Sequence, residues 1–154
     1  MTLLTMIVKM GEGLSKTCAI FFLTLLFSLP LGLVVAFGRM SKNRVISMIV
    51  KFYISIMRGT PLMLQLMVVY FGPYYLFHIK VGSSYRLTAT FIGFVINYAA
   101  YFAEIYRSGI QSMPVGQYEA AEILGYGKVQ TFFKIIFPQV MKRILPSITN
   151  ETIT

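Results

Sequence analysis

The sequence predicts an all-α integral membrane protein, and three observations support this. Of the 154 residues, 56% are hydrophobic and only 12% are charged. The mean hydropathy is +0.71. The chain also contains apolar runs of about 20 residues, the length that a helix needs to cross the hydrocarbon core. Soluble domains carry about 25% charged residues, so half that share leaves too little polar surface to cover a globule of this size.

The composition excludes several other classes of protein. Thirteen Phe and ten Tyr exclude a disordered chain. Cys18 is the only cysteine and His78 the only histidine, which excludes a disulfide framework and a Cys/His metal site. The net charge of +9 is compatible with a nucleic-acid-binding face or with the cytoplasmic loops of a membrane protein. The hydropathy favours the second interpretation.

The first predicted span covers residues 17–37, which include no charged residue. Small side chains recur at every fourth position, at Thr24, Ser28, Gly32 and Ala36. Such a ridge allows another helix to approach closely. Pro30 is expected to kink the span, with neighbouring helices satisfying the freed carbonyl. A signal peptide fits less well, because the apolar run is too long and no A-x-A cleavage site follows.

A short basic loop, residues 39–44, leads to an amphipathic segment. Within residues 45–57 and just beyond, polar side chains recur at helical spacing, at Ser47, Lys51, Ser55 and Arg58. We expect a helix near the membrane interface. The sequence Thr60-Pro61 predicts the next helix start, with Thr60 as the cap and Pro61 in the first turn.

The second and third predicted spans cover about residues 61–79 and 87–106. The second is apolar except for Gln65, an expected break at Gly72-Pro73 and the terminal His78. The third carries polar or small residues on one face, at Gly93, Asn97, Tyr101, Glu104 and Ser108.

Glu104 allows two interpretations. An ionised carboxylate near the bilayer centre costs at least about 2.5 kcal/mol. Glu104 could therefore pair with Arg107 or Ser108 at the cytoplasmic end of the span. Alternatively, it lines a translocation path or gate together with Asn97, Tyr101 and Arg107.

The cytoplasmic segment, about residues 107–143, contains a short helix. Pro114 suits a first helical turn, and Gly125 suits the left-handed position that ends a helix. About ten residues lie between them, with Glu119 and Glu122 in the first two turns. A short, capped, exposed helix without a core of its own suggests docking to a partner. A solvated connector fits the pattern equally well.

This segment also resembles a known motif. Glu119-Ala-Ala-x3-Gly125-x9-Ile135-x-Phe137-Pro138 resembles the EAA motif of bacterial ABC-importer permeases, with Phe137 where that motif has leucine. Residues 58–65, Arg-Gly-Thr-Pro-Leu-Met-Leu-Gln, resemble a segment of the polar amino-acid permeases, the histidine, glutamate, glutamine, arginine and cystine group. Residues 97–107 resemble the third-span signature of that group. Further matches continue in register, so the resemblance covers roughly residues 11–154.

The resemblance implies an incomplete type I ABC-importer permease-like helical bundle with a cytoplasmic coupling helix. It implies that residues 58–65 form a structural motif, from Arg58, Gly59, Thr60, Pro61 and Gln65. It assigns ATPase coupling to one set of residues: Gln117, Glu119, Ala120, Ala121, Gly125 and Pro138.

The same resemblance implies the activity and the partners. It implies a multi-pass subunit that moves a polar amino acid across the bacterial inner membrane and is not itself an enzyme. The implied partners are cytoplasmic ABC ATPase subunits, a second permease copy or paralogue, and an extracytoplasmic amino-acid-binding protein. No cofactor is expected in this chain. The resemblance implies that the partner binds ATP, and the sequence agrees in having no G-x4-G-K-[ST] pattern.

One feature departs from the family. Such permeases continue with two more crossings after the equivalent of Asn150-Glu151, whereas this sequence stops at Thr154. We therefore expect either a truncated product or fragment, or a departure from the family pattern. The alternative function is a non-transporting role in assembly or regulation. A small intramembrane enzyme is disfavoured, because one His, one Cys and no Asp supply few catalytic groups.

The distribution of Lys and Arg predicts the topology. The 39–51 loop holds four and the 107–143 segment five, against two in the amino-terminal tail and two in the 80–86 loop. Because cytoplasmic loops collect basic residues, the amino terminus is expected outside. Reporter fusions at Ser41 and Gly127 should report the cytoplasm, and a fusion at Ser83 the outside. A cytoplasmic signal at Ser83 would contradict the three-span model.

Overall fold

The computed structural model describes residues 3–78, 82 and 85–153, and within these residues every regular element is a helix. This confirms the all-α class. The end of the second predicted span and the fusion site Ser83 lie outside the described residues. The helices are α1 (Leu3–Arg39), α2 (Arg44–Gly59), α3 (Leu62–Phe77), α4 (Tyr85–Gln111), α5 (Val115–Ile123), α6 (Lys128–Gln130), the π-helix η1 (Thr131–Ile136) and α7 (Phe137–Ile153).

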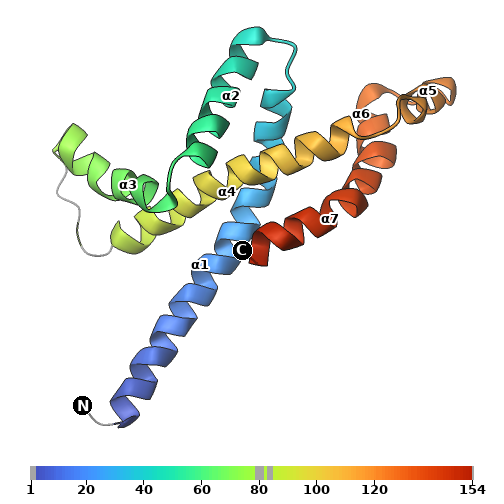
Figure 1. Ribbon diagram of the computed structural model, residues 1–154. Helices are drawn as coiled ribbons and strands as arrows, with labels where there is room; N and C mark the ends of the chain where they lie inside the picture. The colour runs from blue at the N-terminus through green and yellow to red at the C-terminus, as the bar shows by residue number, and fades with distance from the viewer. Residues whose placement is uncertain (1–2, 79–81, 83–84, 154) are drawn as a thin grey trace.

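The two longest helices, α1 and α4, cross near the middle of the structure (Figure 1). The α2–α3 pair lies along one part of α4, α7 folds back beside another part, and α5 lies at the far tip. Both α1 and α4 are long and apolar enough to cross a membrane. The α2–α3 pair, bent by 112° at its break, is long enough for a third crossing if it forms one broken span.

Three sequence expectations about prolines are wrong. Helix α3 continues through Gly72-Pro73 instead of breaking there, and it ends one turn later at His78 (φ 54°), whose N–H donates to the Tyr74 carbonyl. A proline removes a single hydrogen bond from a helix, so helical bonding resumes after it. Pro61 and Pro114 are N-cap residues with extended backbone, and neither lies inside the first turn.

Thr60 also differs from its expected role as an N-cap. It follows the last residue of α2, and its hydroxyl donates to the carbonyl of Ile56 (2.8 Å). Its side chain therefore completes the end of α2 instead of starting α3. Helix α1, like α3, continues through its internal proline, Pro30.

The α1–α4 crossing is a contact between two backbones. All four members of the predicted ridge on α1 are buried. A β-carbon on Gly32 would lie 2.8 Å from Cβ of Phe102 and 3.2 Å from the carbonyl oxygen of Ala99. The facing surface of α4 is made of small buried residues, Ala99, Ala100 and Ala103. The predicted close approach along this ridge is confirmed.

Side-chain amides close the bend between α2 and α3. Gln65 Nε2 lies within hydrogen-bond distance of three acceptors, and its two hydrogens are shared among them. The acceptors are the carbonyls of Met57 (2.9 Å) and Thr60 (3.1 Å) and the Thr60 hydroxyl (2.8 Å). Asn97 Nδ2 on α4 donates to Gln65 Oε1 (2.8 Å) and to the Met57 carbonyl (3.2 Å). The end of a helix leaves carbonyls without partners, and a membrane offers no water to satisfy them. These amides therefore stabilise the bend and tie it to α4.

Gly32→Ala should destabilise the crossing, because the added methyl group forces two backbones apart. Overpacking of this kind costs about 1–3 kcal/mol. The matched control is Gly72→Ala in α3, where a β-carbon meets no atom within 4 Å. Thermal unfolding of the purified chain in detergent checks this. Equal melting temperatures for the two variants would contradict the backbone contact.

Gln65→Leu should destabilise the bend, because it removes the side-chain donor of the Thr60 carbonyl and one of the two partners of both the Met57 carbonyl and the Asn97 amide. An unsatisfied buried polar group costs about 1–3 kcal/mol. The control Gln111→Leu removes an exposed amide that accepts from Arg107, and it should change stability by less than about 0.5 kcal/mol. The same unfolding assay distinguishes them, and a Gln65→Leu variant as stable as the control would refute the role of the amide.

Candidate functional site

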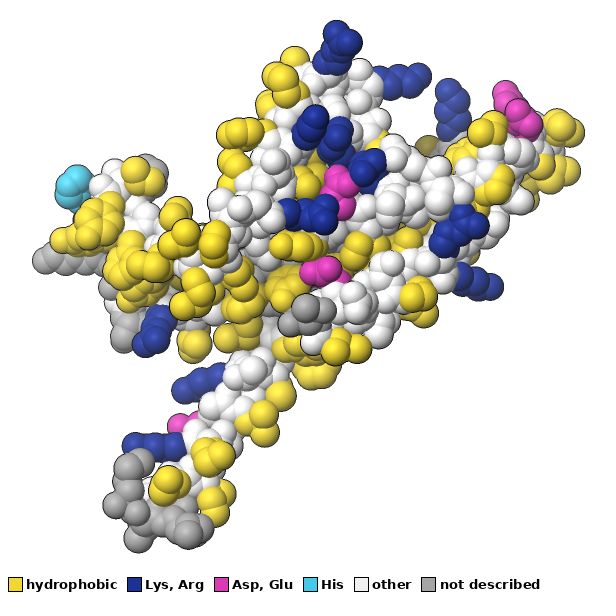
Figure 2. All heavy atoms as spheres, viewed as in Figure 1, with side chains coloured by type: hydrophobic (Ala, Val, Ile, Leu, Met, Phe, Trp, Pro, Cys, Tyr) yellow, Lys and Arg dark blue, Asp and Glu magenta, His cyan; other side chains and the backbone are white. Residues whose placement is uncertain are grey.

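The first candidate site is the polar surface of α4 around Glu104. Arg107 Nη2 and Nε donate to Glu104 Oε2 at 2.6 and 2.9 Å, and Arg39 Nε of α1 lies 4.0 Å from Glu104 Oε1. The Arg58 guanidinium of α2 lies 5.3 Å from the ring centre of Tyr101. Figure 2 shows dark-blue basic side chains gathered around an acidic one in the region where α2 meets α4. The carboxylate is thus held among guanidinium groups from different helices.

Arg39 joins three helices in this cluster. Its Nη1 donates to the Ser47 hydroxyl of α2 (3.2 Å), which in turn donates to the Arg39 carbonyl (2.9 Å). The sequence does not single out Arg39, because Lys42 and Arg44 follow it closely as equivalent basic residues. Only the folded chain brings it to Glu104, 65 positions later.

The four predicted path residues divide into two groups. Tyr101, Glu104 and Arg107 are partly buried and share the polar surface of α4. Asn97, only 5% exposed, is enclosed by the α2–α3 bend. The Arg107 contact, in which two nitrogens donate to Glu104 Oε2, is the ion pair that one interpretation of Glu104 expects. Both interpretations remain compatible with this geometry, since an ion pair can also line a path.

The second candidate site is the helix α5 with the turn that follows it. The Gly125 N–H donates to the Glu122 carbonyl (2.9 Å), and the Tyr126 N–H donates to the Ala121 carbonyl (3.0 Å). These bonds form a Schellman motif, which requires a left-handed residue after the helix. Gly125 has φ 77°, so its predicted conformation is confirmed. The turn reverses the chain toward η1.

Helix α5 exposes most of its surface at the tip of the structure (Figure 1). Ala121 is its one buried residue and faces the protein, whereas Glu119, Ala120 and Glu122 are exposed. Large apolar side chains beside them are also exposed, including Ile123 at 87%. Partial burial raises the pKa of the Tyr118 phenol above its ordinary value. An exposed surface that combines apolar and acidic side chains is typical of a docking site.

Pro138 and Gln117 lie where the coupling segment meets α7. Pro138 is the second residue of α7 and follows the π-helix η1. A proline ring crowds the carbonyl four residues earlier, and the wider turn of a π-helix gives that carbonyl more room. The Gln117 side chain contacts Gln139 of α7. Sequence reasoning missed the roles of Gln139 and Arg143, although these two residues are four positions apart and therefore share one face of a helix.

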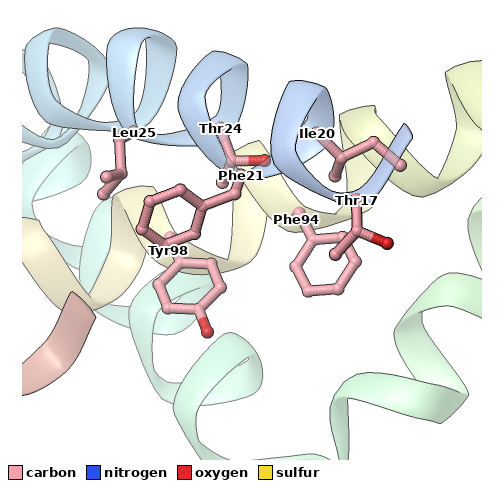
Figure 3. A pocket seen from close by; sticks show the side chains of 7 residues that line it. All are labelled: Thr17, Ile20, Phe21, Thr24, Leu25, Phe94 and Tyr98. Atoms are coloured by element: carbon pink, nitrogen blue, oxygen red, sulfur yellow. The ribbon is translucent and has the colours of Figure 1, made fainter. Parts of the chain in front are cut away.

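A cavity of about 310 Å³ lies between α1 and α4 (Figure 3). Its lining is Thr17, Ile20, Phe21, Thr24, Leu25, Phe94 and Tyr98. Apart from hydroxyl groups the lining is apolar, and none of these side chains carries a charge. The carboxylate of an amino acid would find no charged partner here, so the cavity does not suit a polar amino acid.

Comparison with known proteins identifies the family. The family model described as "Binding-protein-dependent transport system inner membrane component" matches residues 28–154. A putative glutamine transport system permease protein GlnP of Rickettsia bellii is 40% identical over 142 residues, which cover 92% of this chain and 64% of that protein. The arginine transport system permease protein ArtQ of Bacillus subtilis is 41% identical over 145 residues, with 93% and 64% covered.

A solved structure agrees with these relatives. The crystal structure of an amino acid ABC transporter with histidines contains a chain that is 35% identical, with a TM-score of 0.78. The match covers 99% of this chain and 71% of that one. The chain spans somewhat under two thirds of the length of the GlnP and ArtQ relatives. The resemblance read from the motifs is confirmed, and the chain belongs to the family of inner-membrane components of binding-protein-dependent transport systems.

Proposed function

We propose that this chain is the permease part of an ATP-driven importer that moves a polar amino acid across the bacterial cytoplasmic membrane. The observation that carries the proposal is α5, a rigid helix ended by a Schellman turn and exposed at the tip of the structure. The named relatives support the substrate class, because they are described as permeases for glutamine and for arginine. Those descriptions lend no support to an assembly or regulatory fragment.

In this proposal α5 docks into a cytoplasmic ATPase subunit that binds and hydrolyses ATP. Ala120 keeps the exposed side of the helix thin, and Glu119 can meet basic groups of the partner. Ala121 is the buried residue of α5, and α5 packs against η1. Gly125 allows the chain to reverse, and Pro138 lies in the first turn of α7, the helix to which the segment returns.

The other proposed partners follow from the family. They are a second permease copy or paralogue and an extracytoplasmic protein that delivers the amino acid. The proposed orientation places the amino terminus outside and α5 in the cytoplasm, in agreement with the distribution of basic residues.

We also propose that Tyr101, Glu104 and Arg107 line the translocation path, with Asn97 stabilising its wall. The Arg107–Glu104 pair lies within α4 and would travel with it, whereas Arg39 belongs to α1. A movement of α4 relative to α1 would therefore separate Arg39 from Glu104 without leaving the carboxylate unpaired. Such an arrangement permits a gate to move without exposing an isolated charge to the membrane.

Gly125→Val tests the coupling role. A β-branched residue tolerates positive φ poorly, and strain of about 1–3 kcal/mol is expected. The variant should displace α5 while the distant spans stay intact. In the full-length permease assembled with its ATPase, amino-acid uptake and binding-protein-stimulated ATP hydrolysis should fall together, at a normal membrane level.

The matched control is Gly127→Val, two residues further along the same turn. Gly127 has φ −69° and ψ 156°, a conformation that valine adopts readily. This variant should retain nearly full activity in both assays. Wild-type uptake and stimulated ATPase activity in Gly125→Val would refute the assignment of α5 as the coupling helix.

A further inference from the structure

We propose that Gln139 and Arg143 of α7 are positioning residues that make the coupling segment move as one body with α7. Both are hydrogen-bonded across to the segment that carries α5. The inference rests on the proposed function of α5 and adds a second route from α5 into the membrane helices. The first route is the direct chain connection through residues 112–114 to α4.

Gln139 reaches α5 with one side-chain amide group. Its Nε2 donates to the Ile135 carbonyl one turn earlier (2.9 Å) and to Gln117 Oε1 of α5 (3.1 Å). An amide nitrogen has two hydrogens, so these two bonds use both of them. The bond to Ile135 holds the side chain in place on the helix. The Gln117 bond is therefore made by a fixed group, which can transmit displacement.

Arg143 holds the joint between α4 and α5. Its Nη1 donates to the carbonyl (2.6 Å) and to the hydroxyl (2.9 Å) of Ser112, the residue that follows the end of α4 at Gln111. The last carbonyls of a helix lack partners and carry partial negative charge. A guanidinium at this point therefore satisfies the helix end and attracts it electrostatically.

The two contacts act from the same side of α7, because residues four positions apart lie on one helical face. Next to these two residues in the chain, Val140 and Ile144 are buried. Ile144 packs against Gly109 of α4 so closely that a β-carbon on Gly109 would overlap the Ile144 side chain. A packed apolar contact thus prevents α7 from sliding along α4. Displacement of α5 would then pull on α7 as well as on α4.

The first test measures the linkage without the ATPase. Nitroxide labels at Ile123→Cys on α5 and Leu145→Cys on α7 occupy exposed positions, 87% and 57% exposed. Cys18 is replaced by serine so that only these two sites react. In the full-length permease in nanodiscs, the distance distribution between the labels should broaden in Gln117→Met and in Arg143→Met. The control Ser147→Ala, at an exposed position of α7, should leave it unchanged.

The second test measures coupling in the unlabelled, assembled transporter. Gln117→Met, Gln139→Met and Arg143→Met should each lower the number of amino-acid molecules imported per ATP hydrolysed by about two- to tenfold. This fold-change corresponds to the loss of one or two hydrogen bonds. Because Gln117 and Gln139 share one bond, Gln117→Met combined with Gln139→Met should lose no more than Gln139→Met alone. Arg143→Lys keeps a cationic donor and should retain most of the coupling.

The outcomes separate this inference from the proposed function. Unchanged distance distributions in Gln117→Met and Arg143→Met would overturn the inference. So would broadened distributions with unaltered import per ATP. If the unmutated transporter imported no amino acid, the proposed function would fail, and the distance measurement would still decide whether the two side chains hold α5 to α7.

Discussion

The contact of the α1 backbone with α4 at Gly32 is the constraint on which the remaining structure depends. Two helices in lipid gain little from the hydrophobic effect, so close packing between small residues must hold them together. Gly32 and the alanines of α4 allow that approach. With α4 fixed against α1, one of its faces receives the α2–α3 bend and another receives α7. The position of each functional group is thus defined relative to α4.

A second constraint is the satisfaction of backbone carbonyls wherever a helix stops. At the α2–α3 bend the donors are the amides of Gln65 and Asn97. At the end of α4 the donor is the Arg143 guanidinium. At these two places the donor reaches the carbonyl from another segment, so the break in the helix is also a tertiary contact. This explains why long polar side chains occur in a chain that is otherwise strongly apolar.

These two constraints give the molecule a rigid part and an exposed part. The crossing helices, α2 and α7 share buried contacts. Helix α5 extends from them, with one buried residue and a turn that only glycine adopts easily. A short helix held at its base by α4 and α7 can transfer displacement in either direction. The arrangement is consistent with a part of the molecule that is moved by a partner.

Much of this organisation could be read from the sequence by itself. Hydropathy determined the helical membrane class, the four-residue spacing of small side chains determined the ridge on α1, and Gly125 determined the end of α5. These features depend on neighbours in the chain, so local patterns suffice to predict them. The proline positions were predicted less well. A proline is compatible with an N-cap, a first turn or a helix interior, and tertiary packing selects among these.

Only the tertiary structure decided which distant side chains meet. The pairing of Arg39 with Glu104, of Asn97 with Gln65, and of Gln139 with Gln117 joins residues from separate helices. No periodicity within one helix encodes such a contact, because it depends on the angle and register at which two helices pack. The bend between α2 and α3 follows the same rule, since its direction is set by the groups of α4 that bind its carbonyls.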